Sequence, residues 1–221
     1  MSTHSASASF TGALATPHAL ATEAGMRAYR DGGNAIDAAI VAAAVLTVVY
    51  PHNVALGGDL MALLRTPDGE VRCVNASGWA GGAVDAAGLR ARHGRWLPAR
   101  GADAVTVPGG IRGWEALRRF GARLTWERTL RAAEATARVG AAVAPSLATH
   151  IADAENADLF GTEDFDRVFR PGVAACGRET TSRSMRWPTR SRYCGTRART
   201  PSTRVSSPSA RSNTCGRTDH P

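Results

Sequence analysis

The 221-residue chain contains no lysine, so all 27 of its basic side chains are arginines. Because lysine codons are rich in A and T, this absence indicates a GC-rich coding sequence. The chain also has only four cysteines, with no Cys-x-x-Cys pair and no histidine at metal-ligand spacing. We therefore expect free thiols, no metal, no cofactor and a reducing, cytoplasmic location.

No hydrophobic run is long enough to cross a membrane. The longest apolar segment, Ala35 to Tyr50, is short and rich in alanine. The first ten residues, Met1 to Phe10, lack the basic start and the apolar stretch of a secretory signal. The sequence therefore predicts no membrane partner.

The net charge of +8 is confined to the C-terminal part of the chain. Residues 1–176 hold 17 arginines and 17 acidic side chains, whereas residues 177–221 hold 10 arginines and 2 acidic side chains. The latter segment has no Leu, Ile or Phe, so it cannot bury enough apolar surface to offset the entropy cost of ordering. We predict a disordered N-terminus over residues 1–11, a folded domain over 12–176 and a disordered tail over 177–221.

Within the predicted domain, hydrophobic periodicity and turn residues indicate helices around one hairpin. Helices are expected over Pro17 to Arg30, Ala35 to Tyr50, Gly113 to Phe120, Thr125 to Val139 and Ser146 to Glu155. An Asp-Gly turn predicts a hairpin of Met61 to Arg65 with Val71 to Val74. Residues 81–103 are expected to hold a short helix and a loop, and Ala104 to Val107 is a further strand candidate.

The most informative pattern is a glycine pair that runs straight into a helix of small residues, from Asp31 to Ile40. Glycine lets one backbone approach another closely, and Asn34 is placed to cap the helix. Asp37 follows within the first turn, where we expect it to bond a neighbouring backbone or arginine and not to perform acid–base chemistry.

Five motifs in one collinear order resemble the N-terminal part of the large subunit of the γ-glutamyltransferase family. They are Thr16 to Gly25, Gly32 to Ala39, Val49 to His52, Leu56 to Asp59 and Val107 to Trp114. The resemblance covers roughly residues 12–170 and includes Leu124 to Trp126 with the helix that follows.

The resemblance implies an α/β fold, namely a partial αββα sandwich of the N-terminal-nucleophile hydrolases, mostly helical in this portion. In that family a precursor cuts itself before a threonine, whose hydroxyl becomes the nucleophile and whose amine becomes the base. An acyl-enzyme is then passed to water or to an amino acid, in glutathione-type metabolism. The threonine lies in the small subunit, so the resemblance implies that this chain holds no catalytic residue and is inactive without that partner.

One substitution within the resemblance bears on the substrate, a small-molecule amide or γ-glutamyl compound. In typical members an arginine after the strand binds the α-carboxylate of the γ-glutamyl group through a bidentate ion pair. Aligned on Ala80, that position is Ser77 here, which implies a different acyl amide. Asn75 and Ser77 are therefore the candidate substrate-binding residues. The alternative is that they only form the turn after the strand.

Four other features are interpreted as structural. His18 and His52 each follow a proline and are expected to cap or hydrogen-bond locally. Asp59 replaces a glycine that is usual in the family's glycine-rich turn, and this turn lacks the strand-to-helix placement of a phosphate loop. The run Thr180 to Ser182 only superficially resembles the family's cleavage point, so we interpret it as a polar loop.

The sharp change of composition after residue 177 suggests a shift of reading frame. In the shifted frame, the last base of one codon is read together with the first two bases of the next. This frame gives alanine at Met185-Arg186, alanine at Trp187-Pro188 and leucine at Tyr193-Cys194. The other positions permit a helix-forming string with a family-like Gly-Pro-Asp-Ala-Phe-Tyr segment. We expect the frame to slip between Arg170 and Met185 and the product to end prematurely.

The alternative function is that of a non-enzymatic fragment whose arginine-rich tail holds nucleic acid weakly through phosphate contacts. The tail shows no basic helix, zinc pattern or aromatic platform. Nucleic acid is therefore the less favoured partner.

Overall fold

The computed structural model describes residues 12–159, Phe169 and residues 184–185. The chain divides into two units, residues 1–189 and residues 190–221, and every described residue lies in the first. Apart from residues 184–185, the two ends for which the sequence predicts disorder lie outside the described residues, so that prediction stays untested.

Helices make up most of the regular structure in the described part. They are α1 (Ala19–Arg30), α2 (Ala35–Val49), α3 (Ala86–His93), α4 (Gly110–Arg118), α5 (Trp126–Val139) and α6 (Pro145–Ala152), with 3-10 helices η1 (Ala102–Ala104) and η2 (Ala154–Leu159). Strands β1 (Met61–Arg65) and β2 (Val71–Asn75) form an antiparallel hairpin, and β3 (Ala141–Ala142) pairs with β4 (Ser184–Met185). The described helices are all too short or too polar to cross a membrane.

Side-chain caps explain where three of these helices begin. Nδ1 of His18 accepts the backbone N–H of Leu20 at the start of α1, which confirms the local role expected of this histidine. Asn34 and Asp37 form a reciprocal capping box at the start of α2. The hydroxyl of Thr125 accepts the backbone N–H of Arg128 and caps α5. The polar residue before each apolar run therefore determines where the helix starts.

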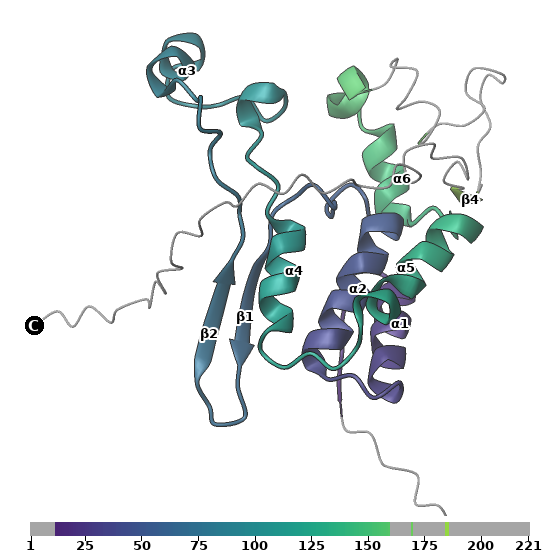
Figure 1. The fold of residues 1–221 in the computed structure, drawn as a ribbon. Helices are drawn as coiled ribbons and strands as arrows, with labels where there is room; N and C mark the ends of the chain where they lie inside the picture. Colours follow the sequence, from purple (N-terminus) through teal and green to yellow (C-terminus); the bar gives the residue numbers. More distant parts are fainter. Residues whose placement is uncertain (1–11, 160–168, 170–183, 186–221) are drawn as a thin grey trace, which may run out of the picture. The chain divides into compact units, whose positions relative to one another are not determined.

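Helices α1, α2 and α5 pack together into one layer (Figure 1). Small residues line the α1–α2 contact, and a Cβ atom on Gly25 would lie 2.8 Å from the carbonyl oxygen of Ala38 and 3.3 Å from Cβ of Ala42. The two helices approach closely because these positions carry almost no side chain. This is the close packing that the alanine-rich run predicts.

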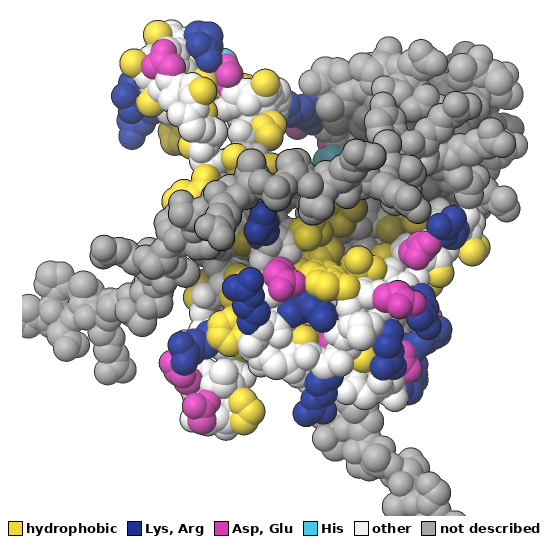
Figure 2. All heavy atoms as spheres, viewed as in Figure 1, with side chains coloured by type: hydrophobic (Ala, Val, Ile, Leu, Met, Phe, Trp, Pro, Cys, Tyr) yellow, Lys and Arg dark blue, Asp and Glu magenta, His cyan; other side chains and the backbone are white. Residues whose placement is uncertain are grey.

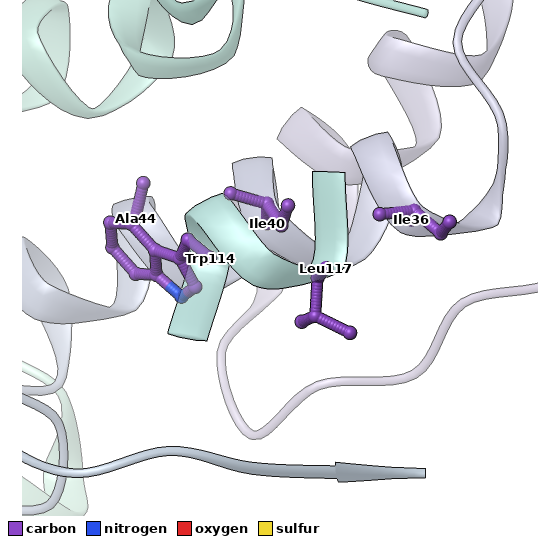
Figure 3. Close-up of a cluster of buried hydrophobic side chains, with 5 residues drawn as sticks. All are labelled: Ile36, Ile40, Ala44, Trp114 and Leu117. Atoms are coloured by element: carbon purple, nitrogen blue, oxygen red, sulfur yellow. The ribbon is translucent and has the colours of Figure 1, made fainter. Parts of the chain in front are cut away.

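The β1–β2 hairpin packs against α4 and α2 through only one of its faces. Ala62, Leu64 and Val74 contact a buried cluster drawn from the two helices (Figure 3): Ile36, Ile40, Ala44, Trp114 and Leu117. The opposite face is apolar but exposed, with Met61 73%, Leu63 79% and Val71 64% accessible. Strand alternation thus divides the hairpin into a packed face and an open face.

Three predictions of secondary structure are wrong in detail. Residues 104–107 form no strand, because η1 occupies the first of them. The N–H of Val107 does bond the carbonyl of Trp79 at 2.9 Å, but Pro108 has no N–H with which to continue such a pairing. Helix α4 begins at Gly110 and not at Gly113, since the carbonyl of Gly58 accepts the Gly110 N–H at 2.9 Å and supports the first turn from outside. The last predicted helix ends at Ala152 and continues as η2.

Candidate substrate site at the end of strand β2

Asn75 and Ser77 lie together where β2 ends. Oδ1 of Asn75 accepts the backbone N–H of Ser77 at 3.1 Å and also the hydroxyl of the same serine. The Asn75 side chain is exposed and Ser77 is half-buried. The local turn that the alternative interpretation predicts is therefore present. A substrate-binding role for the pair stays a prediction.

Two glycine-rich segments, distant in sequence, converge on this turn. Leu60 and Ala76 exchange backbone hydrogen bonds of 3.1 and 2.7 Å, which joins the segment before β1 to the end of β2. Gly58 O accepts the N–H groups of Gly109 (3.2 Å) and Gly110 (2.9 Å) at the start of α4. The Pro-Gly-Gly loop and the Gly-Gly-Asp turn thus hold one another beside the candidate residues.

The glycines at this junction are required by close backbone approach. A Cβ atom on Gly109 would lie 2.1 Å from the carbonyl oxygen of Ala76. Gly78 has a φ of +85°, and its Cβ would lie 2.1 Å from the carbonyl oxygen of Val107. The hydroxyl of Thr106 adds a bond of 3.1 Å to the carbonyl of Ser77. Sequence reasoning missed Thr106 and Val107 as supports of the site, and the glycine density was the only signal.

A hollow of about 690 Å³ opens beside the same junction. Its lining runs from Pro51 to Ala55 and from Gly58 to Met61, and it includes the exposed Asp59 carboxylate. The hollow shares Gly58 with the backbone junction. A small molecule in the hollow would therefore lie close to the turn that carries Asn75 and Ser77.

The candidate residues themselves are uncharged. Elsewhere on the described surface arginine and acidic side chains are interspersed (Figure 2), for example in the α5 ion pairs Arg131–Glu127 (3.1 Å) and Arg138–Glu134 (2.7 Å). On α3, His93 and then Arg92 hydrogen-bond Asp103 and lower the pKa of its carboxyl group. Among the described residues no group of three or more metal-ligating side chains is placed to hold an ion.

The structure separates the remaining sequence candidates. Asp37 is fully buried and accepts three backbone N–H groups, which confirms its structural interpretation. The prediction for His52 is wrong, because both of its ring nitrogens are buried without a hydrogen-bond partner in the described part. Pro51 and the turn direct this ring toward α6, where it contacts His150. Thr180 to Ser182 lie outside the described residues.

Comparison with known protein families identifies the family of this chain. The family model described as Gamma-glutamyltranspeptidase matches residues 21–188. The chain belongs to the gamma-glutamyltranspeptidase family. Among curated proteins, this chain is 44% identical over 118 residues to the oxamate amidohydrolase proenzyme of Klebsiella pneumoniae. The match covers 52% of this chain and 22% of the Klebsiella protein. It is 37% identical to the glutathione hydrolase-like YwrD proenzyme of Bacillus subtilis, covering 62% and 26% respectively.

The structural comparison gives the same family. The gamma-glutamyltranspeptidase of Pseudomonas nitroreducens superposes on this chain with a TM-score of 0.66 at 27% identity. The superposition covers 80% of this chain and 51% of the Pseudomonas chain. The matches cover the N-terminal part of the family. The chain spans about a quarter of the length of the curated relatives it matches.

Proposed function

We propose that this chain is the N-terminal part of the large subunit of a γ-glutamyltransferase-like amidohydrolase or acyltransferase of the N-terminal-nucleophile type. The observation that carries the proposal is the family match over residues 21–188 on a fold whose motifs meet at one backbone junction. The nucleophilic threonine and its amine base would come from a segment outside this sequence. This chain would contribute the scaffold and part of the acyl pocket, and it would be inactive alone.

The open face of the hairpin supports a sandwich architecture for the complete enzyme. Met61, Leu63 and Val71 expose apolar area on this face, which is costly to leave in water. In an αββα arrangement a second sheet would cover this face, while α2 and α4 already cover the other. The proposed small-subunit partner would complete that second layer.

The candidate site supports a substrate other than a γ-glutamyl compound. A serine hydroxyl both donates and accepts hydrogen bonds, and an asparagine amide does the same, so Ser77 and Asn75 suit an uncharged acyl oxygen. Neither side chain supplies the bidentate positive group that binds a free α-carboxylate well. The 44% identical relative is named for hydrolysis of oxamate, a small amide without a γ-glutamyl group that does carry a carboxylate, so the name supports only the absence of a γ-glutamyl substrate. The nucleic-acid alternative has no support among these matches.

Reconstitution of the enzyme tests the proposal directly. The 221-residue chain would be produced alone and together with a family small subunit that carries the nucleophilic threonine, and release of ammonia or amine would be measured. The panel would include oxamate, glutathione, γ-glutamyl-p-nitroanilide and an uncharged acyl anilide. We expect no turnover by the chain alone and hydrolysis of a non-γ-glutamyl amide by the processed pair. Turnover by the chain alone, or a processed pair inactive on every amide, would contradict the proposal.

A further inference from the structure

Two histidines from distant parts of the chain meet at the end of α2. His52 lies in the turn that follows α2, and its ring centroid is 5.4 Å from that of His150 on α6. The centroid of the His52 ring is also 4.1 Å from that of Tyr50, the residue that follows α2, and the two ring planes are tilted by 52°. The three rings form a continuous contact between the α2 turn and α6.

The surroundings of the His52 ring favour its neutral form over its protonated form. Both ring nitrogens are buried, and neither has a hydrogen-bond partner in the described part of the chain. A protonated imidazole would present two N–H donors and a positive charge without an acceptor, which is costly in a buried position. The titratable groups on the elements around it are Tyr50, Asp59 and His150, and no hydrogen bond joins any of them to His52.

Several contacts hold the α6–η2 segment, residues 145–159, in the described part of the chain. Leu147 is buried, and Asn156 donates from Nδ2 to the carbonyl of His150 at 2.8 Å. Arg100 donates to the Glu155 carbonyl at 3.1 Å and to the side chain of Asn156. The ring contact of His52 with His150 joins this segment to the turn after α2.

We propose that the His52–His150 contact is a pH-sensitive latch, which docks the α6–η2 segment on the α2 turn when both rings are neutral and releases it when His52 is protonated. The latch is independent of the proposed activity. His52 also lines the hollow beside Gly58 and Asp59.

The direction of the pH effect follows from linkage. Burial first, and the nearby His150 second, lower the pKa of His52 below the ordinary value of 6.5. The released segment, with a solvated His52, therefore binds a proton more readily than the docked one. Docking is at full strength above pH 6.5 and weakens as the pH falls below it.

Hydrogen exchange of the full chain, read by mass spectrometry between pH 8 and pH 5 with correction for intrinsic exchange chemistry, tests the latch. We expect loss of amide protection at low pH in peptides covering α6 and η2, and unchanged protection in α1 and α2. In His52→Phe, which keeps an aromatic ring without a titratable nitrogen, α6 should stay protected throughout. The matched control His93→Phe, which changes a histidine on α3, should keep the pH-dependent loss.

Three results would overturn the proposal. They are equal protection of α6 at both pH values, a pH-dependent loss that persists in His52→Phe, and a His52 titration midpoint at or above 6.5 by NMR of the unmodified chain. The NMR titration needs no variant, so it decides the question even where His52→Phe fails to fold.

Discussion

Asp37 Oδ1 accepts the backbone N–H of Leu124 at 3.0 Å, across 87 residues of sequence. The second carboxylate oxygen accepts the N–H groups of Arg123 and Asn34, each at 2.9 Å. One fully buried side chain in the first turn of α2 therefore satisfies its own helix cap and anchors the loop between α4 and α5. A carboxylate that accepts several backbone donors is a strong, directional link.

Replacing this carboxylate should destabilise the whole domain. Asp37→Ala leaves three backbone donors without a partner, and we expect it to lower the free energy of unfolding by about 3 kcal/mol or more, measured by urea denaturation. Asp37→Asn keeps one acceptor oxygen and should cost less. In the control Asp31→Ala, an exposed residue just after α1, the change should stay within about 0.5 kcal/mol. Equal effects of Asp31→Ala and Asp37→Ala would contradict this role.

The junction glycine should tolerate no side chain. Gly109→Ala places Cβ at 2.1 Å from the carbonyl oxygen of Ala76, so the end of β2 has to move. We expect a loss of at least about 2 kcal/mol in unfolding free energy. Gly82→Ala is the matched control, because a Cβ there meets nothing within 4 Å. If both variants melt at the temperature of the unmodified chain, the junction is not packed as described.

Ser77 should govern recognition of a charged acyl group in the reconstituted enzyme. Ser77→Arg adds a bidentate cation at the end of β2, and we expect kcat/KM for γ-glutamyl-p-nitroanilide to rise by about tenfold or more, equivalent to about 1.4 kcal/mol. Ser77→Gln adds length without charge and should give no such gain. A rise of the same size with glutamine would show that side-chain volume, and not charge, limits the activity.

The open face of the hairpin should promote association of the isolated chain. Exchanging Met61, Leu63 and Val71 together for threonine keeps β-propensity while removing exposed apolar area, so light scattering should report less aggregate at an unchanged melting temperature. Leu64→Thr lies on the packed face of the same strand and serves as the contrast. It should cost about 2 kcal/mol in unfolding free energy. Aggregation that is insensitive to the triple substitution would argue against an exposed face.

The reading-frame hypothesis makes a prediction about the gene and not about the fold. The family match runs to residue 188, inside the arginine-rich tail and past the expected slip between Arg170 and Met185, so the match does not test the hypothesis. Resequencing should recover a frame that continues with family-like residues after this point. An uninterrupted frame through Pro221, without such a continuation in the alternative frame, would refute the hypothesis.

Much of the local structure could be predicted because its causes are local. The caps at His18, Asn34 and Thr125 and the Asp-Gly turn act within a few residues, and the corresponding helix starts and hairpin agree with the structure to within about two residues. The failures have distant causes. The Val107 segment is held by bonds to Trp79 and Ser77, and the His52 ring contacts His150 on α6, which follows it by almost one hundred residues.

The sequence by itself determined the family and the helix caps, since these depend on residue type and spacing. The tertiary structure alone decided that the three glycine-rich segments meet around Gly58 and Ala76, that Asp37 anchors a loop 87 residues away, and that His52 faces His150. The physical reason is that backbone hydrogen bonds and ring contacts of this kind form only once the α2–α4 cluster has brought the segments together. No pattern within one segment specifies its partner.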